Sequence, residues 1–312
     1  MDHRQLEALY WITRLGSFAA AARKLNTSQP AISQRIRDLE RSLGVPLFDR
    51  SRRKAVLTPQ GHEVAAGAEQ LLSMAAELQE RVAKSGLLYG LVRAGVTETI
   101  ALTWLPALVE RVNEALPNVT LELDVDLMRN LWEKFERGNL ELLLLSGPVS
   151  KPDLIREYLG STPYVWMSAP KPNLPQRPIT PADLKSLPVI TLGAASTLHD
   201  VSLGWSKDQG QPLHSRDICN SLAVVAALTK AGLGISLLPP LIYGEEIESG
   251  RLVVLDSEPA LPPIEFWAVF PRRPVSPLPA AVTRFAREVS TFDFDRDPRA
   301  LLPELGEAHE PA

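Results

Sequence analysis

The spacing of apolar residues at the start of the chain predicts two short helices. The apolar residues of segment 6–13 share one helical face, and Gly16 can end that helix in the left-handed conformation that glycine tolerates. Ser17 then provides the N-cap of a second helix over residues 18–25. Its run of four alanines allows a neighbouring helix to approach closely.

A third helix is predicted directly after a tight turn at residues 26–28. Ser28 is its N-cap, Pro30 lies in the first turn, where a missing amide donor does no harm, and Gly44 follows its end. Its apolar residues are spaced by 4, 3 and 4 and predict one buried stripe: Ile32, Ile36, Leu39 and Leu43. Its outer face is polar and basic. This arrangement is typical of a helix-turn-helix, in which the second helix enters the DNA major groove.

Residues 45–58 predict a two-stranded wing. An apolar anchor at 45–48 precedes a basic tip at 50–54, where cations would suit phosphate contacts. Residues 1–58 carry eleven Lys or Arg and five Asp or Glu, a net charge of +6, while the remainder carries −10. A basic head on an acidic body suggests that one end meets a polyanion. By itself, this charge would fit a solvated basic face equally well.

A long helix is predicted from Thr58-Pro59 to about Lys84. Its apolar residues repeat at spacings of 4 and 3: Val64, Ala68, Leu71, Ala75, Leu78 and Val82. Such a heptad seam indicates either a dimer contact or a helix that packs on its own chain. The small alanines between larger residues favour a close helix pair.

From Leu88 the pattern changes to strands that alternate with helices, which is typical of parallel sheets with crossover helices. Strands are expected at 88–96, 119–125, 140–145, 164–169, 188–191, 234–238 and 266–270. Helices are expected at 99–116, 127–138, 199–208, 220–231 and 279–291. The Pro-rich segment 163–188 is interpreted as a crossing between two subdomains, and residues 293–312 as a solvated, disordered tail.

Two parts of the chain resemble the LysR-type transcriptional regulators. The block GSFAAAARKLNTSQPAISQRIRDLERSLGVPLFDRSRRKAVLTPQG resembles their N-terminal winged helix-turn-helix. Residues 88–292 resemble their effector-binding domain, most clearly at GLVRAGVTET, LPALVERVNEALPNVTLEL and AGLGISLLPP. That domain is similar to type 2 periplasmic binding proteins, with two α/β lobes around a cleft.

The resemblance implies a division of the chain into a DNA-binding domain, a linker and an effector domain. The α-rich winged helix-turn-helix covers 1–58, the linker and dimerisation helix 59–87, and the effector-binding domain 88–292. Lobe I is expected at about 88–162 and 267–292, and lobe II at about 163–266.

The resemblance also implies which residues meet DNA. Base edges and nearby phosphates would be contacted by Ser28, Gln29, Pro30 and Ser33, with further contacts from Arg35 and Arg37. The wing residues Arg50, Arg52 and Arg53 would lie near the minor groove or the flanking backbone. This wing is more basic than a common family form with glycine at its tip.

Ligands of open parallel sheets bind beyond the carboxyl ends of the strands, beside helix N-termini. This rule selects Thr97, Glu98, Thr99, Ser146, Gly147, Ser196 and Thr197, and the resemblance adds Asn220 and Ile235. The hydroxyls could instead only cap helices, and residues 146–148 could be only a turn. Glu98 at the cleft mouth disfavours a multiply charged anion unless His199 or backbone amides compensate. We expect a neutral or singly charged effector.

Catalytic motifs are absent from the sequence. The five histidines lack metal-binding spacings, there is no Cys-x-x-Cys or Gly-x-Ser-x-Gly, and Gly232-Leu233-Gly234 is a weak match to a nucleotide loop. Cys219 has His214 five residues upstream but no third partner, which favours a buried apolar role. We therefore predict no enzyme activity, cofactor or metal site. The alternative class is a solute-binding module without DNA function. The intact wing and the missing export signal argue against this alternative.

The predicted function is a sequence-specific transcriptional regulator that a small molecule controls from the cleft between the lobes. Its expected partners are duplex operator DNA, the effector and a second copy in a homodimer or homotetramer, with RNA polymerase as a further candidate. A single cysteine and the lack of any stretch near the roughly 18 apolar residues that span a bilayer predict a cytoplasmic protein without membrane contact.

Overall fold

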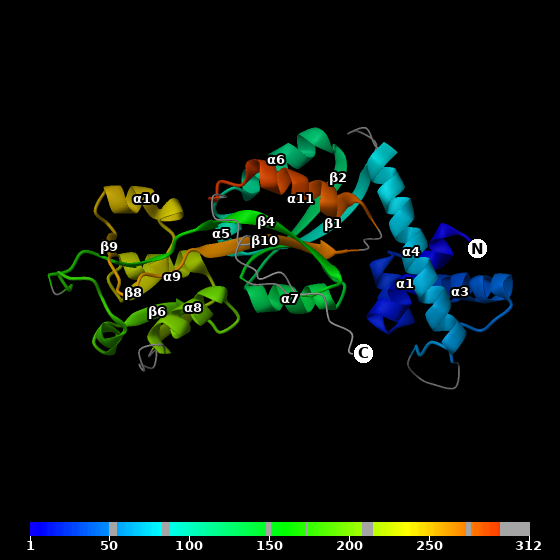
Figure 1. Cartoon of the computed structure of the whole chain (residues 1–312), viewed down its shortest axis with the longest axis horizontal. Helices are drawn as coiled ribbons and strands as arrows, with labels where there is room; N and C mark the ends of the chain where they lie inside the picture. The colour runs from blue at the N-terminus through cyan, green and yellow to red at the C-terminus, as the bar shows by residue number, and fades with distance from the viewer. Residues whose placement is uncertain are drawn as a thin grey trace, which may run out of the picture.

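The computed structural model describes residues 1–49, 55–82, 88–147, 151–172, 174–207, 215–272 and 276–293. The molecule is elongated, with a helical head at one end and two α/β lobes in line beyond it (Figure 1). The wing tip, which includes Arg50, Arg52 and Arg53, lies outside the described residues. No helix in the described ranges is long and apolar enough to cross a membrane.

The head consists of α1 (His3–Leu15), α2 (Phe18–Lys24) and α3 (Gln29–Leu43). Ser17 and Ser28 cap α2 and α3, since their Oγ atoms accept from the amides of Ala20 and Ala31. Gly16 and Gly44 end α1 and α3 with φ of 66° and 72°, as the sequence predicted. The stripe on α3 is shorter than predicted: Ile32, Ile36 and Leu39 are buried, but Leu43 is 38% exposed at the helix end.

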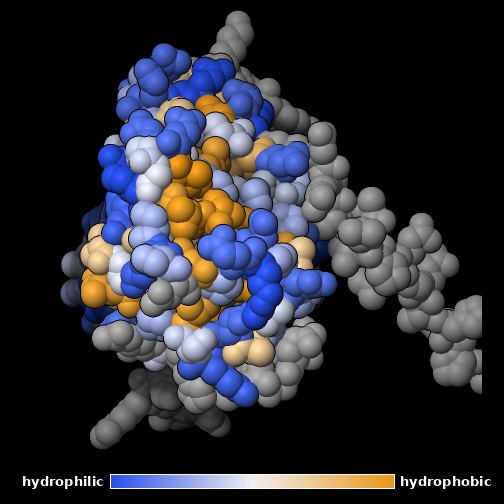
Figure 2. Space-filling model, turned by 90° about the vertical axis from the view of Figure 1, so that its left-hand side faces the viewer, coloured by the Kyte–Doolittle hydropathy of each residue, from blue (hydrophilic) through white to orange (hydrophobic). Residues whose placement is uncertain are grey.

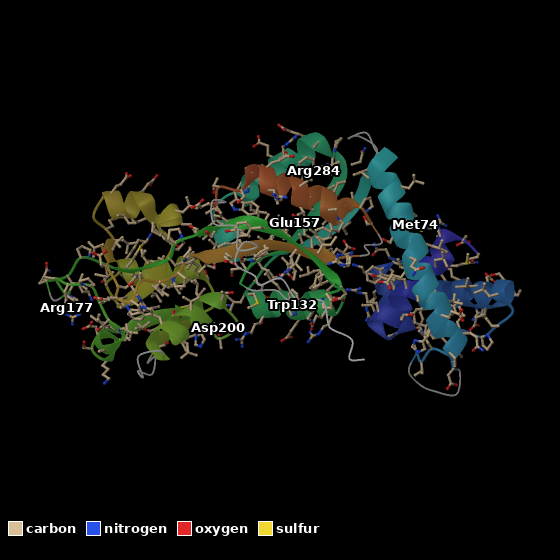
Figure 3. The ribbon with its side chains drawn as sticks, viewed as in Figure 1. Met74, Trp132, Glu157, Arg177, Asp200 and Arg284 are labelled. Carbon is tan, nitrogen blue, oxygen red and sulfur yellow. The ribbon has the colours of Figure 1, made fainter. Side chains whose placement is uncertain are left out.

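The linker helix α4 (Pro59–Val82) starts at Thr58, whose Oγ1 accepts from the Gly61 amide at 2.9 Å. Its predicted seam divides between two faces. Ala68, together with Leu72, is buried in the core of the head. Three other apolar side chains are exposed to solvent: Leu71, Met74 (Figure 3) and Leu78. One face of α4 therefore packs on its own chain and another is left uncovered.

Lobe I is built on a five-stranded sheet in the order β2-β1-β3-β10-β4. The strands are β1 (Tyr89–Val96), β2 (Asn118–Val125), β3 (Leu142–Ser146), β4 (Leu154–Thr162) and β10 (Ile264–Pro271). Its helices are α5 (Glu98–Ala101), α6 (Leu105–Ala115), α7 (Met128–Glu136) and α11 (Leu278–Val289). The sheet is mixed rather than parallel, because β10 runs antiparallel to β3 and β4. The predicted helix 99–116 is split into α5 and α6, and β4 was not predicted.

Lobe II has a second five-stranded sheet, in the order β7-β6-β8-β5-β9. The strands are β5 (Val165–Ser168), β6 (Val189–Leu192), β7 (Ser215–Cys219), β8 (Ile235–Leu238) and β9 (Val253–Leu255). They pack with the 3-10 turn η1 (Pro181–Lys185) and with α8 (Thr197–Lys207), α9 (Leu222–Lys230) and α10 (Pro240–Glu248). The sequence did not predict β7, β9 or α10. Cys219, at the end of β7, is half-buried rather than fully buried.

The chain crosses between the lobes in two places. It leaves lobe I after β4 through Pro163-Tyr164, so the crossing is shorter than the predicted segment 163–188, and it returns before β10. The backbone of Asp293 exchanges two hydrogen bonds with Ser161, at 2.8 and 2.9 Å. Residue 293 is therefore paired with lobe I, whereas the sequence placed it in a disordered tail, and residues 294–312 lie outside the described ranges.

Candidate functional site

The helix α3 lies at the end of the head that is remote from the lobes (Figure 1). Ser28, Gln29 and Pro30 are exposed at its N-terminus, and Ser33 and Arg35 are half-buried behind them. Arg37 is exposed, and its Nη2 donates to Gln34 Oε1 at 2.7 Å. Ser28, Gln29, Pro30 and Arg37 are therefore accessible on α3, whereas Arg35 lies on the other side of the buried stripe from Ser33 and Arg37.

Glu40 is a buried acid that sequence reasoning missed. Its Oε1 accepts from the amides of Leu47 at 2.8 Å and Phe48 at 3.4 Å. Phe48 in turn bridges to Leu57 across the base of the predicted wing. The carboxylate therefore fixes the wing base to α3, since buried amides need acceptors. The available signal was its spacing of four from Ile36, which places an acid on the core face.

A small cavity lies between the lobes, with a volume of about 30 Å³. This is room for roughly two water molecules, so the cleft is closed in this conformation. Six of the predicted effector residues line it: Thr97, Glu98, Thr99, Ser146, Ser196 and Thr197. Glu98 and Asp126 are the charged side chains among its described lining residues, and both are acidic.

Direct contacts join the lobes around this cavity. Ser146 Oγ donates to Thr197 Oγ1 at 3.0 Å. On the outer side, Arg129 on α7 forms an ion pair of 3.0 Å with Asp200 on α8. At the hinge, Thr99 Oγ1 and the Tyr164 hydroxyl lie 2.5 Å apart. Burial raises the pKa of Tyr164, which keeps this phenol neutral.

Glu98 joins the two lobes through three hydrogen bonds. Its carboxylate accepts from Ser221 Oγ at 2.9 Å, from the Ala223 amide at 3.2 Å and from the Leu222 amide. These donors form the N-terminus of α9, where unpaired amides and the helix dipole attract an anion. The sequence analysis considered backbone amides that could offset the negative charge of Glu98 for an incoming anion. The α9 amides instead bind the Glu98 carboxylate itself.

The hydroxyls that line the cavity do not all act as helix caps. Thr97 precedes α5 but makes no side-chain cap bond, and its buried Oγ1 has no partner among the described residues. Ser196 does act as a cap, because its Oγ accepts from the Leu198 amide at 3.2 Å. Gly147 has φ of 95°, and a Cβ there would lie 3.1 Å from Thr197 Oγ1.

Four predicted residues do not line the cavity: Gly147, Ile235, Asn220 and His199. Ile235 is 2% exposed and packs in the apolar core of lobe II, because its β8 side chain points to the other face of the sheet. Asn220 is exposed just before α9, where Ser221 is the N-cap. The Nδ1 of His199 is buried away from the cavity lining and has no partner in the described part of the chain.

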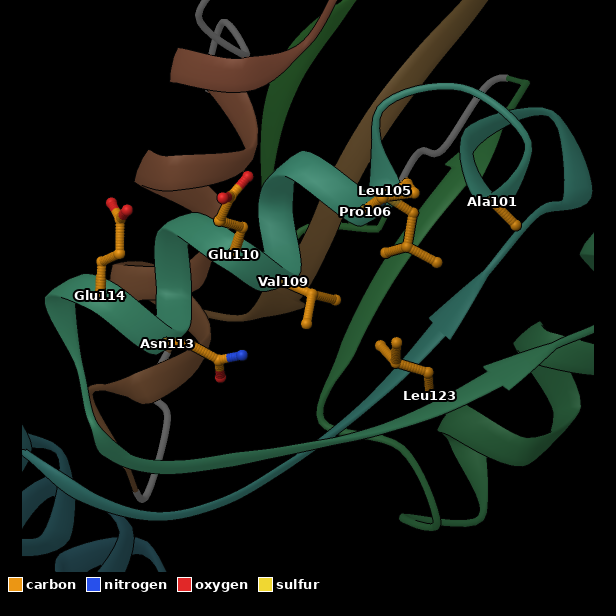
Figure 4. A pocket seen from close by; sticks show the side chains of 8 residues that line it. All are labelled: Ala101, Leu105, Pro106, Val109, Glu110, Asn113, Glu114 and Leu123. Atoms are coloured by element: carbon orange, nitrogen blue, oxygen red, sulfur yellow. The ribbon is translucent and has the colours of Figure 1, made fainter.

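Larger hollows lie on the outside of the molecule. A groove of about 810 Å³ runs between α6 and β2 and is lined by Leu105, Val109 and Leu123, with Glu110 and Glu114 along one side (Figure 4). Another, of about 1000 Å³, separates the head from lobe I. Neither collects buried hydroxyls as the central cavity does. No group of three or more His, Cys, Asp or Glu side chains within the described ranges could hold a metal ion.

Comparisons with known proteins agree with this architecture. Residues 3–62 match the family model for bacterial regulatory helix-turn-helix proteins of the lysR family, and residues 85–291 match the LysR substrate binding domain. The regulator BbuR of Bordetella bronchiseptica is 29% identical over 81% of this chain and 78% of its own. A probable RuBisCO transcriptional regulator of Trichormus variabilis is 28% identical over 96% and 91%.

Solved structures show the same fold. A full-length OxyR variant from Pseudomonas aeruginosa superposes with a TM-score of 0.63 at 24% identity, and covers 94% of this chain and 95% of its own. ArgP from Mycobacterium tuberculosis also gives 0.63, at 22% identity and 94% and 99% coverage. The alternative of a solute-binding module without DNA function does not hold, because both domain models match. The chain belongs to the LysR family of transcriptional regulators, which are effector-controlled DNA-binding proteins rather than enzymes.

Proposed function

We propose that α3 reads operator DNA and that a small molecule bound between the two lobes controls this binding. The observation that carries the proposal is the convergence of hydroxyls from both lobes on one cavity, beside the N-termini of α8 and α9. A ligand there would contact both lobes at once. It could therefore shift the balance between closed and open arrangements by its difference in affinity for the two.

For DNA recognition we assign base readout to the start of α3. Gln29 and Ser33 lie one helical turn apart, and Gln29 is exposed. Arg35 and Arg37 would add contacts beside them. The wing residues Arg50, Arg52 and Arg53 would supply sequence-independent affinity through phosphates.

The effector is expected to be neutral or singly charged. The charged lining residues named above are both acidic, so a multiply charged anion would meet repulsion. Hydroxyls such as Thr97, Thr99 and Ser146 would fix its orientation by hydrogen bonds.

We further propose that the regulator acts as a homodimer or homotetramer. The exposed residues Leu71, Met74 and Leu78 on α4 suit a second copy of the same helix. A tetramer needs a further surface, for which the groove of Figure 4 is available on lobe I. Figure 2 shows apolar surface at the lobe II end as well. Ile218 and Val224 are exposed apolar side chains of lobe II. RNA polymerase is the further partner at a promoter.

A metabolite screen by thermal shift on the full chain, coupled to operator binding, tests this proposal. A compound that raises Tm and changes the affinity for the operator is expected to lose both effects in Thr97→Ala and Thr197→Ala. If both variants kept the full response while a substitution remote from the cleft abolished it, the effector site would lie elsewhere.

A further inference from the structure

The Glu98 carboxylate occupies the position at which a free anion would bind α9. It reaches from lobe I to lobe II and accepts hydrogen bonds from Ser221 Oγ, the Leu222 amide and the Ala223 amide. The helix has nine residues, and its first turn presents amides that have no acceptor within the helix. Oriented amides of this kind bind carboxylates and phosphates.

A second observation indicates that this corner of the cleft is built for a ligand. Thr97 is 8% exposed and lines the cavity, and its Oγ1 has no hydrogen-bond partner within the described ranges. Buried hydroxyls are normally satisfied, and the Thr97 hydroxyl is poised for a group that enters the cleft.

We propose that Glu98 is a tethered occupant of an anion subsite at the α9 N-terminus, which holds the lobes together without effector and keeps free carboxylates out. This inference rests on the proposed effector role of the cleft and specifies the ligand class. The effector should approach Glu98 with an amine or a neutral hydrogen-bond donor. A free carboxylate would have to displace the Glu98 carboxylate, which is present at a high effective concentration because the chain holds it beside α9.

Chemical rescue tests this assignment in the full-length protein. Glu98→Ala should lower Tm by roughly 4 °C, because three hydrogen bonds between the lobes are lost. Acetate at tens of millimolar should then raise the Tm of this variant by a few degrees, since it can fill the vacated subsite. Wild type should show no acetate-dependent shift beyond that produced by equal chloride.

Arg129→Ala is the matched control. It breaks the Arg129–Asp200 ion pair between the same lobes but leaves Glu98 on α9, so acetate should not rescue it. Glu98→Gln tests the charge while the volume is kept: its Tm should lie between those of wild type and Glu98→Ala, without acetate rescue. A Glu98→Gln variant as stable as wild type would overturn the proposal even if Glu98→Ala did not fold. So would acetate stabilising wild type and Glu98→Ala equally, or neither.

The same samples separate this inference from the proposed function. Acetate rescue of Glu98→Ala supports the anion subsite whatever happens on DNA. If the rescue occurred while neither the substitution nor acetate changed operator affinity, the subsite would stand and the control of DNA binding by the cleft would fail.

Discussion

The Nζ of Lys24 lies 2.9 Å from Oε1 of Glu141 and joins the last turn of α2 to the residue before β3. The Lys24 side chain is only 8% exposed, and its Nζ also lies 4.6 Å from the centre of the Trp11 ring. Beside this pair, a Cβ on Gly138 would come within 2.7 Å of Leu15 Cδ2, so the backbone of lobe I directly contacts α1. The DNA-binding head is thereby docked on the effector domain of its own chain.

The two partners of this ion pair should respond differently to substitution. Burial lowers the pKa of Lys24, and Glu141 partly offsets that effect. Glu141→Gln leaves a buried ammonium without a countercharge and should reduce the free energy of unfolding by about 2 kcal/mol. Lys24→Met replaces the charge by an apolar side chain and should stay within about 1 kcal/mol of wild type. Urea unfolding measures both; equal losses would contradict this account.

Gln29 should determine one base of the operator. Gln29→Ala is expected to weaken operator binding by roughly 1–3 kcal/mol, with the loss confined to one base position. Ser42→Ala is the control, because Ser42 lies more than three turns further along α3 and its Oγ donates to the Leu39 carbonyl. Binding to a panel of operator variants provides the measurement. An equal loss on random DNA would remove Gln29 from sequence readout.

A charge on the exposed face of α4 should disrupt subunit association. Leu78 is 55% exposed in the single chain, so Leu78→Asp should leave the fold intact. If a second copy covers this face, burial of the carboxylate should raise the dimer dissociation constant by about 10-fold or more. His62→Asp, on the opposite side of the helix, should have little effect. Analytical ultracentrifugation measures the dissociation constants of both variants. If the dissociation constant of Leu78→Asp equalled that of wild type, the dimer interface would lie elsewhere.

Thr97→Val should separate effector response from stability. The hydroxyl it removes is buried without a partner in the described structure, so the Tm should be unchanged or slightly higher. A ligand bonded to that hydroxyl should bind about 10-fold more weakly. Thr103→Val is the control: Thr103 bonds the Thr99 carbonyl at 2.7 Å and does not line the cavity. A ligand titration that gave equal affinities for wild type and Thr97→Val would exclude Thr97 from the site.

The Asp183 carboxylate accepts from the Thr180 amide at 2.7 Å in the capping box of η1, and it should make the stability of the protein depend on pH in the acid range. Hydrogen bonding from Arg177 is the main cause that lowers the pKa of Asp183 to about 2. Because the folded value lies below the unfolded value, this carboxylate stabilises the protein above about pH 4, and the contribution disappears as the pH falls towards 2. Asp183→Asn should therefore lose about 1 kcal/mol at neutral pH. In urea titrations its difference from wild type should shrink in acid; a constant difference would refute the linkage.

Local sequence determined the helical head and the polar outer face of α3. Caps at Ser17 and Ser28, the glycines at 16 and 44 and the stripe on α3 depend on neighbours within one or two turns, so periodicity could locate them. The hydroxyls after β1, after β3 and before α8 were also predictable, because strand ends in such sheets meet at one edge. The sequence blocks that resemble the LysR family include the head and the residues around the end of β1.

Tertiary structure decided what depends on distant partners. Local periodicity does not encode the pairing of strands that are distant in sequence. Such pairings determine the antiparallel position of β10 in lobe I, the burial of Ile235 and the short strands β7 and β9. The division of the α4 seam likewise depends on which side chains the head covers. The sequence placed Glu98 at the cleft mouth but could not show that it bonds to α9, and it gave no partner for Glu141. Both partners appeared only when folding brought α9 and Lys24 within hydrogen-bond distance, because the partner of a carboxylate is set by geometry in space.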